Sequence, residues 1–184
     1  MAYWQLVPFF PKFLREHQIS KEYLGYIISV FALSFIISSL FTGKFLLKYI
    51  NRVNGCFIGA LFVIVNLLGL GSLSYMTSNS QIITFAFIFQ MLGGIGNGIN
   101  SPCTIAVLSS YKENRETYIG YFEVCAGIGG IIGPLLGSAI YFLGGFQAPF
   151  FVIGSGYFVV VVGFYLITKS RKVVHQQGEE LDSD

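Results

Sequence analysis

Charged side chains are scarce in this chain of 184 residues, because Asp, Glu, Lys and Arg together make up only 11% of it. No Asp occurs before Asp182, the two histidines are His17 and His175, and the three cysteines lack metal-ligand or disulfide-like spacing. These absences predict no enzyme activity, no metal site and no cofactor. Apolar residues make up 54% of the chain, with 19 Phe and 22 Gly. A soluble domain of this size would not tolerate that composition on its surface, so it indicates a membrane protein.

The few charges are confined to short segments between long apolar stretches. Five stretches are long enough to cross ~30 Å of hydrocarbon at about 1.5 Å per residue. They cover residues 23–43, 55–76, 82–108, 118–142 and 147–168. A sixth apolar segment, within residues 2–15, is too short to cross alone and lacks the basic start and cleavage site of a signal peptide. We therefore expect an all-α integral membrane protein with five full spans and a partial first helix.

Basic residues are distributed unequally between the two ends of the expected spans. Eight Lys or Arg lie on one side, and three lie on the other, all before the first full span. The eight are Lys44, Lys48, Arg52, Lys112, Arg115, Lys169, Arg171 and Lys172. The positive-inside rule places this richer side in the cytoplasm. The net charge of +2 therefore reflects the orientation of the chain in the membrane. We expect a lipid bilayer to surround the chain and no binding of nucleic acid.

An internal repeat emerges when the chain is compared with itself at a shift of 95 residues. The shift pairs Gly25-Tyr26 with Gly120-Tyr121, and it relates the first two full spans to the last two. It also places Met1 opposite Gly96, in the middle of a span, so we expect the chain to begin partway through its first helix. Residues 173–184 are polar, and we expect them to form a disordered cytoplasmic tail.

Small residues recur at fixed intervals in the stretch 118–142. Gly129, Gly133 and Gly137 are four residues apart, so they share one helix face and form a groove where another helix backbone can approach closely. Pro134 lacks a backbone donor and therefore frees the Gly130 carbonyl. Glycine and proline are both unfavourable in helix interiors, which indicates a specific packing role for this segment.

With Gly120 included, this spacing resembles the antiporter signature in the fifth helix of the major facilitator superfamily, in its drug/proton and vesicular amine branch. Ser138 stands where the family pattern has its last glycine. The resemblance implies that residues 1–172 form the amino-terminal six-helix bundle of a transporter for small organic solutes. Amines, polyamines or drug-like molecules are the implied substrates, moved by alternating access with ion-coupled antiport, for instance of protons.

Alternating access requires a second bundle, so the implied partner is a missing carboxy-terminal half or a second copy of the chain. We expect the polypeptide alone to insert into a membrane without transporting. The alternative is a membrane scaffold or assembly subunit that uses the glycine groove for binding and moves nothing. The sequence does not distinguish the plasma membrane from a vesicular or organellar membrane.

The segment after residue 43 resembles the family's cytoplasmic loop signature in part. Gly43, Lys48 and Arg52 match that pattern, whereas Leu47 stands at its acidic position, so the acid–base pairing of the family cannot form here. The plain interpretation of Lys44, Lys48 and Arg52 is an anchor that faces anionic lipid headgroups.

Polar residues recur on one face of the stretch 82–108. Gln90, Asn97, Ser101 and Thr104 are spaced by seven, four and three residues, which places them together on a helix. Polar side chains at membrane depth face a water-filled cavity or bond to another helix. We regard these four as candidates for lining a substrate cavity, and interhelical hydrogen bonding is the alternative. In the family pattern Gln90 stands at an Arg position linked to proton transfer, and a glycine-rich run follows at 93–98.

Glu123 is the only acidic residue inside an expected span. A charged side chain at the centre of a membrane costs roughly 3 kcal/mol on insertion scales. The surrounding Gly-Tyr-Phe-Glu resembles vesicular polyamine transporters, and this resemblance implies a proton site or a counter-ion for a cationic substrate. The alternative is a structural role, because Glu123 lies near the cytoplasmic boundary, where it could reach water or Arg115.

Other polar or reactive residues inside the expected spans have simpler interpretations. Asn66 is expected to form a hydrogen bond between helices. Cys56, Cys103 and Cys125 are single cysteines in apolar segments, and we expect them to be small core residues.

Overall fold

The computed structural model of the chain describes residues 10–20, 22–111 and 114–181, with side chains up to Lys169. Within these ranges the secondary structure is helical and contains no strand. Five segments are long and apolar enough to cross a membrane. The expectation of an all-α fold with five full spans is therefore confirmed, and the chain is a multi-pass integral membrane protein.

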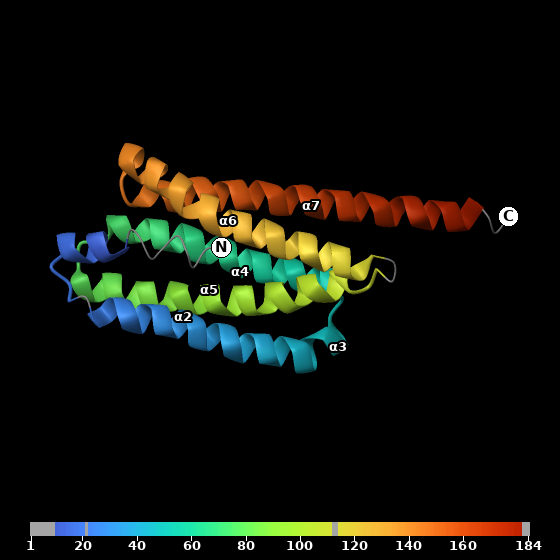
Figure 1. Cartoon of the computed structure of the whole chain (residues 1–184), viewed down its shortest axis with the longest axis horizontal. Helices are drawn as coiled ribbons and strands as arrows, with labels where there is room; N and C mark the ends of the chain where they lie inside the picture. The colour runs from blue at the N-terminus through green and yellow to red at the C-terminus, as the bar shows by residue number, and fades with distance from the viewer. Residues whose placement is uncertain (1–9, 21, 112–113, 182–184) are drawn as a thin grey trace.

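The helices follow one another with short connections (Figure 1). They are α2 (Glu22–Phe41), the π-helical segment η1 (Thr42–Leu46), α3 (Leu47–Tyr49), α4 (Arg52–Ser72), the 3-10 turn η2 (Leu73–Tyr75), α5 (Asn79–Leu108), α6 (Arg115–Gly144) and α7 (Gln147–Leu181). A further short helical segment covers residues 10–16, whereas residues 1–9 of the expected first helix lie outside the described part. The segment from Glu22 to Tyr49 is a single span of 28 residues.

Several helices extend beyond the apolar stretches from which they were predicted. The expected loop between the first two full spans is reduced to residues 50 and 51, because Lys44 and Lys48 continue the helix. Lysine favours helix and can extend its charged end beyond the apolar region. The backbone of α7 is helical to Leu181, so it includes the described part of the segment 173–184, whose disorder stays a prediction. Adding residues to an existing helix carries no nucleation cost, so a polar segment can remain helical.

Helix α5 is the centre of the packing. It lies between α2 and α4, and α7 packs on the other side of α4, whereas α6 makes its main contacts with α7 (Figure 1). An aromatic cluster joins residues 10–16 to the start of α7: the rings of Phe13 and Phe146 stack with centroids 4.0 Å apart, and Phe10 and Phe150 are fully buried beside them. Among the five spans, α4 and α5 are the most buried.

The helix boundaries reproduce the internal repeat. Helices α4 and α7 begin at Arg52 and Gln147, and the spans before them end at Tyr49 and Gly144, so both pairs are 95 residues apart. Arg52 contacts the end of α5, and Phe146, just before α7, contacts residues 10–16. Residues 10–16 thus lie beside the start of α7 in the way that the end of α5 lies beside the start of α4.

The connections are divided between the two ends of the bundle. Residues 50–51 and the end of α7 lie at one end, whereas residues 76–78 and 145–146 lie at the other (Figure 1). Lys48 and Lys169 therefore belong to the same end, and Lys112 lies outside the described residues. The cytoplasmic assignment of this end remains a prediction from the positive-inside rule.

Candidate functional site

The glycine run at 93–98 allows α5 to approach two helices at once. Gly94 and Gly98 pack against α2, where a Cβ would meet the hydroxyls of Ser34 and Ser38. Toward α4, a Cβ at Gly93 would lie 2.6 Å from Cγ of Asn66. Distances of this size exclude larger side chains, because they are shorter than van der Waals contact. The glycines therefore set the close packing of α5 on both of its neighbours.

Gln90 is almost completely buried in the middle of α5. Its side chain is 1% exposed, and its Nε2 has no hydrogen-bond partner among the described residues. An unsatisfied buried amide carries a desolvation cost of about 1–3 kcal/mol unless water or a ligand supplies an acceptor. Among the four candidate residues, Gln90 therefore has the strongest need for a partner that the described protein does not provide.

The other three candidates differ from Gln90 in their surroundings. Asn97 is half-buried and donates from Nδ2 to the Gly93 carbonyl of its own helix at 2.8 Å. Ser101 is half-buried. Thr104 belongs to a polar cluster between α4 and α5, where it contacts Cys56 of the neighbouring helix. Thr104 also lines a pocket, so it fits both the interhelical hydrogen bond and the cavity-lining interpretation.

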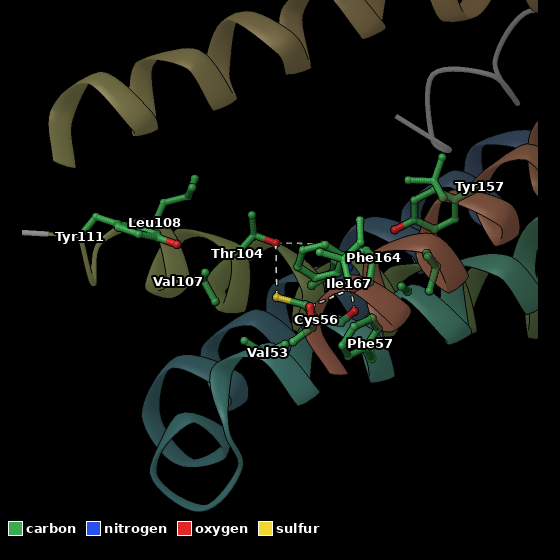
Figure 2. A pocket seen from close by; sticks show the side chains of 15 residues that line it. Val53, Cys56, Phe57, Thr104, Val107, Leu108, Tyr111, Tyr157, Phe164 and Ile167 are labelled. Atoms are coloured by element: carbon green, nitrogen blue, oxygen red, sulfur yellow. Dashed lines mark hydrogen bonds between the residues drawn. The ribbon is translucent and has the colours of Figure 1, made fainter. Parts of the chain in front are cut away.

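This polar cluster contains Asn100, Thr104 and Cys56, and Figure 2 shows the contact between Thr104 and Cys56. Asn100 Nδ2 donates to the Cys56 carbonyl at 3.0 Å, Thr104 Oγ1 donates to Asn100 Oδ1 at 3.2 Å, and Cys56 Sγ lies 3.7 Å from Thr104 Oγ1. The sequence did not identify Asn100, although its position four residues before Thr104 could have indicated it. The cluster connects α4 to α5 and retains hydrogen-bonding capacity on the Asn100 amide and the Thr104 oxygen.

A pocket of about 1060 Å³ lies between α4, α5 and α7 (Figure 2). The described residues that line it include no charged side chain. The residues are Val53, Cys56, Phe57, Ala60, Asn100, Thr104, Val107, Leu108, Tyr111, Tyr157, Val160, Val161, Phe164, Ile167 and Thr168. Thr104 is the one candidate that lines it, so the structure does not bring the four predicted residues together around this pocket. In the described part, no group of three or more His, Cys, Asp or Glu is arranged to hold a metal ion.

The glycine groove lies on the less exposed side of α6. Gly137 is buried, and Gly129, Gly133 and Pro134 are half-buried, whereas Gly120 is exposed with no atom within 4 Å of a Cβ built on it. The opposite side of the helix carries exposed apolar residues, namely Ile128, Ile131 and Leu135. The groove thus faces inward, although Gly137 is the only residue of this helix that is classed as buried.

Glu123 is exposed on α6. It precedes Gly130, Pro134 and Gly137 by seven, eleven and fourteen residues, so it shares the inward side of the helix with them. No ion pair joins Glu123 to Arg115 in the part of the chain that the structure describes, whereas the exposure of Glu123 fits the form of the structural alternative in which it reaches water. Its role remains a prediction.

The three residues of the cytoplasmic signature have different environments. Gly43 is exposed within η1, Lys48 is exposed in α3, and Arg52 donates from Nη1 to the Ala106 carbonyl at 3.1 Å. Ala106 is among the last four residues of α5, whose carbonyls lack intrahelical partners. Arg52 therefore caps α5 in addition to lying at the membrane boundary.

Two simpler predictions have opposite outcomes. Asn66 donates from Nδ2 to the Phe89 carbonyl at 2.7 Å, which confirms a hydrogen bond between α4 and α5. Cys103 is buried and Cys56 is half-buried, but Cys125 is exposed on α6, so the prediction of a core position was wrong for Cys125. The reason is that α6 buries little of its surface against the rest of the chain.

Comparison with known proteins gives a consistent assignment. The Major Facilitator Superfamily profile matches residues 1–182. The mouse MFS-type transporter SLC18B1 is 30% identical over 84% of this chain. Multidrug resistance protein 2 of Bacillus subtilis is 25% identical over 95% of the chain, and the multi-drug resistance efflux pump PmrA homolog of Lactococcus lactis is 28% identical over 84%.

The matched region covers only part of these relatives. It spans 34% of the mouse protein, 42% of the Bacillus protein and 36% of the Lactococcus protein. No solved structure matches the chain.

Proposed function

Because the chain belongs to the Major Facilitator Superfamily, we propose that it forms one helical bundle of a secondary transporter for small organic solutes. Amine, polyamine or drug-like molecules are the proposed substrates, moved by alternating access with ion-coupled antiport. The names of the multidrug relatives support an organic solute. Transport further requires a second bundle, either a carboxy-terminal half or a second copy.

The observation that carries this proposal is the unsatisfied amide of Gln90. Its Nε2 is buried in the middle of a span and has no partner among the described residues. Such a donor is costly in a purely structural position, where an apolar residue of similar size would be at least as stable. An organic solute or a cavity water that accepts a hydrogen bond would satisfy it.

Replacing Gln90 separates a transport role from a structural role. We expect Gln90→Leu to keep or slightly raise stability and to reduce uptake at least about tenfold, as for the loss of a specific contact. Uptake of radiolabelled spermidine and of ethidium, measured in cells with the chain and its second bundle, tests this. Gln81→Leu, at an exposed position on the same helix, is the matched control. Unchanged uptake in a well-expressed Gln90→Leu variant would contradict the proposal.

Glu123 is the proposed proton or cation site. Glu123→Gln keeps the shape of the side chain and removes its ionisation, so we expect normal expression and loss of uptake driven by a pH gradient. Glu116→Gln, exposed in the first turn of the same helix, serves as the control. Undiminished pH-driven uptake in Glu123→Gln would leave the structural alternative as the remaining interpretation.

A second bundle is best sought at the exposed side of α6. Gly137 is buried and therefore unsuitable for cross-linking, whereas Leu135 is 66% exposed. After replacement of the native cysteines, Leu135→Cys should form cross-links when a second bundle is present. Cross-linking with saturable flux supports a transporter, and cross-linking without flux supports the scaffold alternative. Saturable flux from a demonstrably monomeric chain would contradict the requirement for a partner.

A further inference from the structure

The α4–α5–α7 pocket lies apart from the residues on which the proposed transport depends. Gln90 and Glu123 are absent from its lining, and Thr104 is the only shared candidate. The volume of about 1060 Å³ is slightly above the range of about 300–1000 Å³ that is common for small-molecule sites. The chemistry of this pocket can therefore be considered independently of the residues proposed for transport.

The lining separates an apolar body from a polar end. Phe57, Val161 and Phe164 belong to the apolar part, and the Asn100–Thr104–Cys56 cluster forms the polar part. Figure 2 shows the Tyr157 hydroxyl directed toward the side of the pocket where Thr104 lies. Asn100 retains one N–H and the Thr104 oxygen retains a lone pair, so the cluster can both donate to and accept from a ligand. A neutral hydroxyl or carbonyl group matches this combination.

Charge on the ligand is disfavoured at this position. Among the described residues, no Asp, Glu, Lys, Arg or His lines the pocket, and a charge buried without a partner carries a large desolvation cost. Several lining residues of α7, including Val160 and Ile167, are 66% and 60% exposed, so the pocket opens toward the surroundings of that helix. In a membrane protein, those surroundings are lipid at most depths, and an amphipathic molecule can reach the opening from the bilayer.

We propose that the α4–α5–α7 pocket binds an uncharged amphipathic molecule. Its apolar body lies along α4 and α7, and its hydroxyl or carbonyl group bonds to the Asn100–Thr104 pair. A neutral membrane lipid and a neutral drug-like solute share this chemistry. The proposal does not rest on transport, because occupancy of the pocket is measured without flux.

Photolabelling of the purified full chain tests the proposal directly. The probe is a monoacylglycerol with a photoactivatable group in its chain, and the fatty acid with the same chain and an anionic head is the comparison. We expect the neutral probe to label lining residues of α4 and α7, to be displaced by unlabelled monoolein, and to exceed the anionic probe at least about fivefold. Equal labelling by both probes, or labelling confined to α6, would overturn the proposal.

Substitutions identify the pocket as the labelled site. Val161→Trp fills the cavity with a larger side chain. Ile167→Trp blocks the opening of the cavity, and because Ile167 is exposed, this substitution leaves the core packing intact. Both variants should reduce labelling at least about fivefold. Val159→Trp is the matched control, because Val159 is 68% exposed and outside the lining. If Val161→Trp does not fold, Ile167→Trp still decides the outcome. Labelling that is unchanged in a folded blocking variant contradicts the pocket assignment.

The polar end has its own test. Thr104→Val removes the hydroxyl with little change of shape, so monoolein should bind about three- to tenfold more weakly, whereas Thr104→Ser should restore binding. Thr117→Val, exposed on α6, is the control. Mass spectrometry of lipid that copurifies with the chain distinguishes the sources. A retained neutral lipid indicates the bilayer, and its absence together with displacement of the probe by a neutral steroid indicates a solute. Thr104→Val with unchanged affinity would overturn the assigned head-group contact.

Discussion

The contact between α4 and α5 and the surface of α6 are both rich in glycine. The glycines between α4 and α5 are tightly packed, whereas several glycines of α6 have no atoms of other described helices beside them. A Cβ at Gly59 would lie 2.7 Å from the backbone nitrogen of Asn100 and 2.7 Å from the Gly96 carbonyl oxygen, both on α5. On α6, a Cβ at Gly120, Gly127 or Gly130 would meet no atom within 4 Å. Glycine thus permits a close approach between helices without producing one. The approach depends on what the neighbouring helix presents.

Polar groups follow the same division. Asn66 and Asn100 each donate a hydrogen bond across the α4–α5 contact, to the carbonyls of Phe89 and Cys56. On α6, Glu123 is exposed and forms no ion pair among the described residues. Interhelical hydrogen bonds in membranes contribute roughly 0.6–2 kcal/mol each. These hydrogen bonds between α4 and α5 therefore stabilise the bundle, whereas Glu123 of α6 forms no such contact in the described part of the chain and is available for the proposed function.

The largest expected effect comes from enlarging Gly59. Gly59→Val would place two methyl groups against the α5 backbone, which can move only by separating the helices, so we expect a loss of about 3 kcal/mol or failure to fold. Gly120→Val on α6 should change stability by less than about 0.5 kcal/mol. Reversible unfolding in mixed micelles measures both. Equal effects of the two substitutions would remove the distinction between the helices.

A smaller loss is expected when one interhelical hydrogen bond is removed. Asn66→Leu keeps the branched shape of the side chain beside Gly93 but loses the bond to the Phe89 carbonyl, so stability should fall by about 1–2 kcal/mol. Asn54→Leu, at an exposed position of α4, should be nearly neutral. The same unfolding measurement applies, and a neutral Asn66→Leu variant would show that glycine packing alone holds the pair together.

Arg52 contributes at the boundary of the α4–α5 pair. Arg52→Gln shortens the side chain and removes its bond to the Ala106 carbonyl, and we expect a loss of about 0.5–1 kcal/mol. Lys48→Gln tests whether the effect is merely the loss of one basic residue, because Lys48 is exposed and has the same formal charge. Matching losses in both variants would assign the effect to membrane anchoring.

The smallest effect on stability is expected on the outer side of α6. Leu135→Ser should change the unfolding free energy of the isolated chain by less than about 0.5 kcal/mol, because Leu135 is 66% exposed. The same substitution should weaken association with a second bundle, measured by cross-linking from a neighbouring position. A clear loss of stability in the isolated chain would show that this surface already packs within it.

Several features of the fold could be predicted because they depend on residues that are close together in the sequence. The five spans follow from apolar stretches of sufficient length, and Asn66 was correctly predicted to bond between helices because a polar group at membrane depth needs a partner. Helix ends were predicted less well. Lys44 and Lys48 were expected in a loop, but they extend the helix, since hydropathy marks the apolar region rather than the helix boundary.

The role of the candidate site residues stays a prediction, and the structure shows only where these residues lie. Gln90, Asn97, Ser101 and Thr104 do share one helix, but spacing along one helix does not reveal which neighbour each side chain meets. Asn97 bonds to its own helix, Thr104 bonds to Asn100, and the Nε2 atom of Gln90 has no partner among the described residues. The pocket could not be predicted, because its lining comes from three helices.

The sequence by itself determined the all-α membrane class, the five spans and the 95-residue repeat, since hydrophobic length and spacing are local properties of the chain. The tertiary structure alone decided which glycines are in contact, that Glu123 and Cys125 are exposed, and that Asn100 and Tyr157 line a common pocket. These features depend on the rotation of each helix about its axis and on its neighbours. Contacts between residues far apart in the chain set both.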